Sequence, residues 1–152
     1  VADRDPERHR LHGDFNIAFH APEALPGGFD IVFHTTASAD GLQSALDALA
    51  FEGRVIELSW YGDRPVSVAL GGSFHSRRLS ILSSQVGHVA PARRASASRL
   101  DRLAAALAML SDPRLETLVT RRCAFRDLPG AMAGLLAPDA PGIATRIDYG
   151  EE

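Results

Sequence analysis

The chain has 152 residues, of which 45% are hydrophobic and 23% charged, a composition that predicts one globular domain rather than disorder. The net charge of −3 gives no support for nucleic-acid binding, and the apolar runs are too short to cross a bilayer. A single cysteine, Cys123, excludes an internal disulfide and is typical of a reducing cytoplasm, where we expect the protein to reside.

Apolar runs bounded by turn residues alternate with helical patterns along the chain, which predicts an α/β fold of order β-α-β-β-α-β-β-α-β-α-β. The predicted strands cover residues 1–3, 15–19, 29–36, 54–59, 79–84, 118–125 and 143–149, with a further short extended piece at 65–70.

Helix starts are marked by residues that favour the N-cap. Asp5 precedes Pro6 and begins a short helix, and Asp40, Ser98 and Asp127 each precede an apolar stripe at helical spacing. Gly53 follows the second stripe, where a residue that ends a helix is expected.

Five segments in this order resemble the coenzyme half and closing stretch of the medium-chain, zinc-type alcohol dehydrogenases. They are "VADRDPER", "GGFDIVFHTTAS", "FEGRVIELSWYGD", "LSILSSQVG" and "DPRLETLVTRRCAFRDLPGAMAGL". The resemblance covers nearly the whole chain and implies a partial Rossmann-like fold, a mostly parallel sheet flanked by helices. It implies a partial NAD-binding Rossmann domain at 1–97, and helices and a strand at 98–152 that return towards a catalytic domain.

The sequence departs from the family because it contains no G-x-G-x-x-G motif. The first Rossmann strand and the zinc-binding catalytic domain of the family would lie before Val1. In the Rossmann sheet, whose strand order is 3-2-1-4-5-6, the first strand lies between strands 2 and 4, so these two strands would have no shared neighbour. We therefore expect a piece of a larger enzyme, a degenerate gene product or a rearranged sheet.

The resemblance places Asp3 at the end of the second Rossmann strand, where the family holds the adenosine ribose. A carboxylate accepts hydrogen bonds from ribose hydroxyls and repels a 2′-phosphate, which favours NAD over NADP. The alternative is that Asp3 only ends a strand. Arg4 could stack on the adenine or face water.

Ligands bind at the carboxyl ends of the strands in open α/β sheets. By resemblance, three strand ends would contact the dinucleotide, and their residues are Thr35, Thr36, Ala37, Leu58, Ser59, Trp60, Ser83, Ser84 and Gln85. The alternative for Thr35, Thr36 and Ala37 is that they form an ordinary loop that caps a helix. The alternative for Trp60 is that it packs beneath a loop.

The sequence predicts neither a metal site nor a catalytic residue in this chain. The histidines, among them His34, each stand alone or lack a third ligand, and Cys123 has no partner thiol. Zinc, if any, would belong to the missing upstream part. All 16 basic residues are arginines, which excludes a Schiff-base or P-loop lysine, and no G-x-S-x-G motif is present.

We therefore predict the coenzyme-binding portion of an NAD-dependent alcohol or polyol dehydrogenase-like oxidoreductase, with a small alcohol or carbonyl substrate in the full enzyme. The alternative is a non-catalytic remnant that serves oligomerisation or regulation. The segment 79–85 has the character of a covered sheet edge and could pair with a second copy. A Rossmann-like methyltransferase would also use an acidic residue at the end of strand 2, but the later strand ends and the last helix of this sequence fit that class less well.

Overall fold

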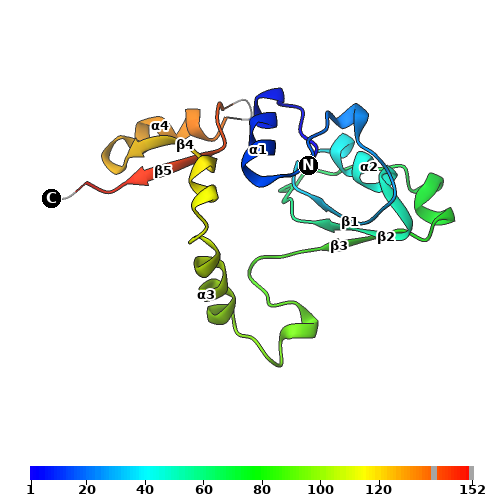
Figure 1. The fold of residues 1–152 in the computed structure, drawn as a ribbon. Helices are drawn as coiled ribbons and strands as arrows, with labels where there is room; N and C mark the ends of the chain where they lie inside the picture. Colours follow the sequence, from blue (N-terminus) through cyan, green and yellow to red (C-terminus); the bar gives the residue numbers. More distant parts are fainter. Residues whose placement is uncertain (138–139, 151–152) are drawn as a thin grey trace. The chain divides into compact units, whose positions relative to one another are not determined.

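The computed structural model describes residues 1–137 and 140–150, and its backbone divides into two compact units. The first unit contains residues 1–9 and 17–99, and the second contains residues 10–16 and 100–152. Both contain parallel strands accompanied by helices (Figure 1), so the expected α/β class with parallel sheets is confirmed. None of the helices in the described ranges combines the length and hydropathy that a membrane span requires.

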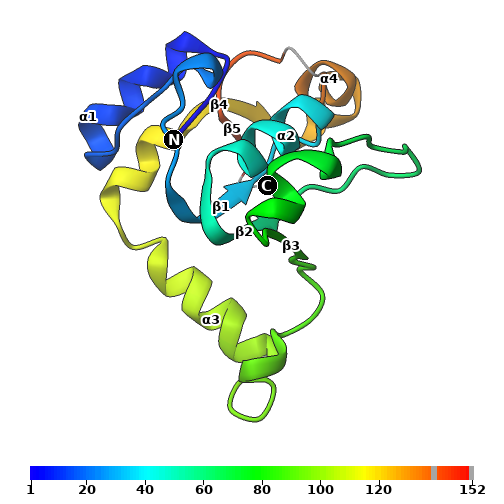
Figure 2. The ribbon, with the colours of Figure 1, turned by 90° about the vertical axis from the view of Figure 1, so that its right-hand side faces the viewer.

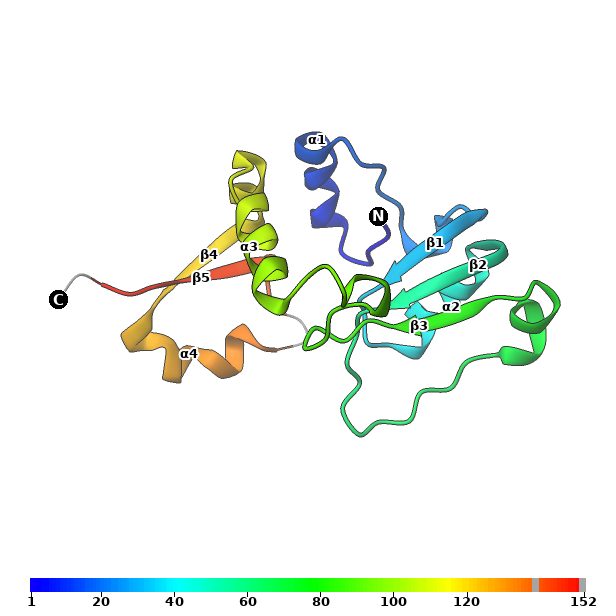
Figure 3. The same ribbon diagram turned by 90° about the horizontal axis from the view of Figure 1, so that it is seen from below.

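The first unit is built on a parallel sheet of three strands, β1 (Phe29–His34), β2 (Leu49–Glu57) and β3 (Ser80–Ser83), in the order β1-β2-β3. Figure 3 shows the three strands running side by side. Their register pairs His34 with Glu57 and Glu57 with Ser83, so all three strands end at the same edge.

The core of this unit lies between the sheet and helix α2 (Ala39–Asp47). The buried apolar residues come from α2, β2 and the residue before β3, and they are Leu42, Ala45, Leu46, Leu49, Val55 and Leu79. Side chains alternate along β1, so Val32 packs against this core whereas Ile31 and Phe33 are exposed on the opposite face.

Two expectations about α2 are wrong. The N-cap is Ser38, whose hydroxyl accepts a hydrogen bond from Gly41 N at 3.1 Å, whereas Asp40 lies inside the first turn. Gly53 lies within β2, which begins at Leu49, five residues before the predicted start at Arg54. A Cβ at Gly53 would lie 3.0 Å from two backbone oxygens, so close backbone approach rather than helix termination requires this glycine.

The N-terminal segment differs more from the expectation. Ala2 forms a single parallel bridge with His20, and no longer strand is present around it. A 3₁₀ turn, η1 (Pro6–Arg10), continues into helix α1 (Leu11–Phe15), so the predicted strand at 15–19 is wrong. Gly13, which we expected to end this helix, lies within it. The helix ends at Asn16, whose φ of 51° is left-handed.

The first unit also contains three short helical turns: η2 (Pro22–Ala24) before β1, η3 (Leu70–Phe74) between β2 and β3, and η4 (Pro91–Arg93) after β3. The piece at 65–70 forms no strand, although Val66 and Val68 pack against the core.

The second unit contains α3 (Arg99–Met109, which begins at the boundary), η5 (Pro113–Leu118), β4 (Val119–Ala124), η6 (Phe125–Asp127), α4 (Leu128–Leu135) and β5 (Ala144–Asp148). β4 and β5 form a two-stranded parallel sheet (Figure 2), and these elements confirm the helices and strands predicted for this stretch. Asp127 takes the N-cap position of α4 without a side-chain capping bond.

Candidate functional site

The carboxyl ends of β1, β2 and β3 are joined by backbone hydrogen bonds that extend the sheet past the last strand residues. Leu58 N donates to His34 O at 3.0 Å, and Ser84 N donates to Glu57 O at 2.9 Å. The loops that follow the three strands therefore leave one edge of the sheet, as expected for ligand-binding loops of an open parallel sheet.

A hydrogen bond between two titratable side chains joins the first two strand ends. His34 is only 3% exposed, and its Nδ1 lies 2.7 Å from Oε2 of Glu57, whose side chain is 11% exposed. The prediction that His34 stands alone is therefore wrong, because the β1–β2 register places these side chains opposite each other on the same face.

Glu57 collects hydrogen bonds from three groups. Besides His34, it accepts from Ser59 N at 2.7 Å and from the Tyr61 hydroxyl at 3.0 Å. Burial raises the pKa of Glu57, but the hydrogen bonds from Ser59, His34 and Tyr61 outweigh it, so the pKa lies below its ordinary value. Burial, together with the hydrogen bond to Glu57 and the charge of that carboxylate, raises the pKa of Tyr61 to about 12.

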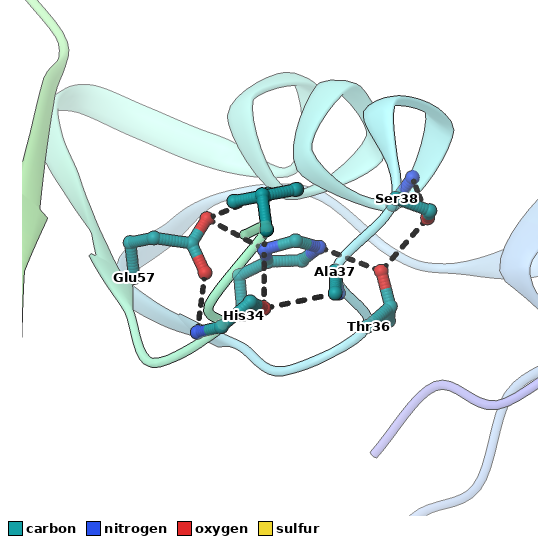
Figure 4. Close-up of polar contacts among 8 residues, drawn as sticks. His34, Thr36, Ala37, Ser38 and Glu57 are labelled. Atoms are coloured by element: carbon teal, nitrogen blue, oxygen red, sulfur yellow. Dashed lines mark hydrogen bonds and ion pairs between the residues drawn. The ribbon is translucent and has the colours of Figure 1, made fainter. Parts of the chain in front are cut away.

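The other nitrogen of His34 extends the network to the loop after β1 (Figure 4). His34 Nε2 lies 2.7 Å from Thr36 Oγ1, which in turn lies 2.8 Å from Ser38 Oγ, the cap of α2. Gly41 closes the far side, because a Cβ there would lie 2.1 Å from Thr36 Oγ1 and 2.9 Å from His34 Nε2. The network thus runs from the largely buried carboxylate of Glu57 to Thr36 and Ser38, two residues that are exposed.

A second link ties the loops after β1 and β2 together. Ala37 adopts a φ of 50°, and its N–H donates to Ser59 Oγ at 3.0 Å. Ser59 is half-buried, whereas the neighbouring Leu58 and Trp60 are exposed, Trp60 by 89%. The alternative that Trp60 packs beneath a loop is therefore wrong for this unit. Thr35 is exposed at the same edge.

The third strand end and the N-terminal acid complete the set of predicted site residues. Ser83, Ser84 and Gln85 are exposed where β3 ends. Asp3 is half-buried; its Oδ1 accepts from Asp5 N at 3.0 Å and its Oδ2 from Arg8 at 2.8 Å, whereas Arg4 is exposed. The structure thus brings together residues 35–37, 58–60 and 83–85 at one edge of the sheet, and gives Asp3 a basic partner that the sequence had not indicated.

Two residues of the network were missed from the sequence: His34 and Glu57. A usable signal existed, since "VFH" and "VIE" each place a titratable residue two positions after a valine inside a predicted strand. Period-two alternation alone places both side chains on the core face. No group of three or more His, Cys, Asp or Glu side chains in the described residues could hold a metal ion.

Solved structures share this arrangement of parallel strands flanked by helices. No protein-family model matches the chain, and no curated protein matches its sequence. The chain is similar to the yhdH oxidoreductase of Salmonella enterica in complex with NADP, with TM-score 0.70, 13% identity, and 98% of this chain and 46% of that chain covered. It is also similar to Bacillus subtilis yhfP with NAD bound, with TM-score 0.65, 16% identity, and 97% and 46% covered.

A third similar structure is the cobalt- and zinc-bound thermostable alcohol dehydrogenase of Pyrobaculum aerophilum, with TM-score 0.66, 14% identity, and 95% and 41% covered. The chain has the fold of part of the zinc-type medium-chain dehydrogenases, as the sequence resemblance predicted, and it spans less than half the length of each of these structures.

Proposed function

We propose that this chain is the coenzyme-binding portion of an NAD-dependent, zinc-type alcohol or polyol dehydrogenase-like oxidoreductase. The observation that carries the proposal is the common edge where β1, β2 and β3 end, with small and hydroxyl-bearing residues on the loops that follow. In this role the bound coenzyme supplies the hydride chemistry, and the chain binds and orients it. The substrate of the full enzyme would be a small alcohol or carbonyl compound.

The proposed contacts follow the order of the strand ends. Asp3 and Arg4 would lie at the adenosine, residues 35–37 near the adenosine and pyrophosphate, and residues 58–60 and 83–85 at the nicotinamide end. Asp3 fits a ribose: a carboxylate has about four acceptor positions, and two N–H groups occupy one on each oxygen. Its negative charge supports NAD over NADP, although Arg8 beside it reduces the repulsion of a 2′-phosphate.

The test is a titration of the ¹⁵N-labelled chain with NADH and, separately, NADPH, followed by amide chemical shifts. We expect shifts concentrated in residues 35–37, 58–60 and 83–85, with NADH binding more tightly than NADPH. Because the sequence has no glycine-rich phosphate loop, the affinity should be weaker than about micromolar. Shifts absent at millimolar NADH, or confined to the second unit, would contradict the proposal.

The alternative role, an oligomerisation module, is supported by the position of β3. This strand is the outer strand of its sheet in the described residues, and Leu82 on it is 45% exposed. We propose that a second copy pairs along this edge. Sedimentation equilibrium should then show a dimer that Leu82→Arg dissociates, and a monomer at all concentrations would contradict it. The single cysteine supports a cytoplasmic location for either role.

A further inference from the structure

The directions of the hydrogen bonds between Glu57 and Ser38 follow from the chemistry of the groups. An ionised Glu57 only accepts, so the Nδ1 of His34, 2.7 Å away, carries the proton. In the neutral imidazole Nε2 is then an acceptor, and the Thr36 hydroxyl at 2.7 Å donates to it. With the Thr36 proton committed, the 2.8 Å contact to Ser38 requires the Ser38 hydroxyl to donate to Thr36.

Both hydroxyl protons are therefore used inside the network, and only acceptor positions remain for a ligand. A hydroxyl oxygen has two acceptor positions. Thr36 uses one for Ser38, and Ser38 uses one for Gly41 N. Each oxygen keeps one free acceptor position, and both residues are exposed.

We propose that Glu57 and His34 are positioning residues that make Thr36 and Ser38 a hydrogen-bond-accepting rim, which binds a sugar hydroxyl of the dinucleotide rather than a phosphate oxygen. The proposal rests on the coenzyme site proposed above and specifies the chemistry of one part of it. A ribose hydroxyl can donate to this rim, whereas a phosphate oxygen would meet lone pairs.

Among the described residues, the charged group that contacts His34 is Glu57 on β2. From the following loop, Ser59 Oγ and the Tyr61 hydroxyl each lie 3.4 Å from Nδ1. On β3 the register partner of Glu57 is Ser83, which is uncharged. From α2, Gly41 approaches Nε2, and the neighbouring Asp40 is exposed.

The first measurement needs no coenzyme. Long-range ¹H–¹⁵N spectra of the free chain at pH 8 should show the His34 ring protonated at Nδ1 and not at Nε2. A ring protonated at Nε2 would overturn the proposal whatever the chain binds, because Thr36 would then have a free proton.

The second measurement is the NAD affinity of the chain and its variants at pH 8. Thr36→Val should bind about fivefold more weakly than the unmodified chain, as expected for the loss of one hydrogen bond. His34→Asn, which removes the acceptor of the Thr36 proton, should also bind more weakly. Thr36→Ser, which keeps the hydroxyl, and His75→Asn, at an exposed histidine, should bind as the unmodified chain does.

The outcomes separate the two proposals. No NAD or NADH response from the unmodified chain at any pH would overturn the coenzyme site and the sugar-binding rim with it. An affinity of the unmodified chain that is unchanged in Thr36→Val or in His34→Asn would overturn the rim alone and leave the coenzyme site standing.

Discussion

Gly41→Ala tests the network most directly, because the new Cβ enters the space occupied by three of its polar atoms. It would lie 2.1 Å from Thr36 Oγ1 and 2.9 Å from both His34 Nε2 and Ser38 Oγ. Thr36 is short and sits between two partners, so relieving the contact requires breaking the hydrogen bonds to His34 and Ser38.

The expected cost can be assembled from typical values. Overpacking costs about 1–3 kcal/mol, and two lost hydrogen bonds cost about 1 kcal/mol each. Alanine gains up to about 1 kcal/mol over glycine in a helix. We therefore expect Gly41→Ala to lower the free energy of unfolding by about 2–4 kcal/mol.

Urea unfolding followed by amide resonances around Leu46 and Val55 would measure this loss in the first unit itself, since the chain contains two compact units. In a Thr36→Ala background the 2.1 Å contact is removed, so Gly41→Ala should cost at least 1 kcal/mol less there, roughly the coupling of neighbouring residues. A Gly41→Ala variant as stable as the unmodified chain would refute the geometry of the network. Gly134→Ala, in α4 with open space around the site, is the matched control and should be neutral or stabilising.

Three further changes test other parts of the first unit. Glu57→Gln should destabilise the chain by roughly 1–3 kcal/mol at pH 7, because the buried charge that three groups bind is lost. The pKa of Glu57 is lowered in the folded chain, so the stability that its charge contributes is complete above the unfolded pKa of about 4.3. This stability is lost as the pH falls through the folded pKa. The unfolding curves of the unmodified chain and of Glu57→Gln should therefore converge in acid. Tyr61→Phe should remove the phenol ionisation expected at about pH 12, seen as a difference in ultraviolet absorbance at high pH; an unchanged titration would contradict the Tyr61–Glu57 hydrogen bond. Ser38→Ala should cost about 1 kcal/mol in thermal or urea unfolding through loss of the α2 cap, whereas Asp40→Ala should cost less, because Asp40 is not the cap.

Local signals in the sequence were sufficient for most of the elements. The β-branched and aromatic residues of β1 and the apolar stripe of α2 each depend on neighbours within a few positions, and both elements were predicted. The parallel α/β class followed from their alternation. The resemblance in five ordered segments predicted the dehydrogenase-like fold that the solved structures share.

The exceptions were set by competition between neighbouring signals. Ser38 and Asp40 are both good caps, and the choice of Ser38 depends on where α2 packs against the sheet. Residues 15–19 have the composition of a strand, but Phe15 completes α1 and lies under the guanidinium of Arg114, 5.8 Å from its ring centroid.

The candidate site was decided by tertiary structure. The sequence placed titratable residues at the ends of two strands, but His34 and Glu57 are 23 positions apart, and only the β1–β2 register brings their side chains to 2.7 Å. Asp3 differs, because its partner Arg8 lies in the adjacent turn η1 and the contact is therefore local. Periodicity and capping are encoded within one or two turns of chain, whereas the partner of a buried charge depends on which strands lie side by side and in what register, and this is settled only when the core packs.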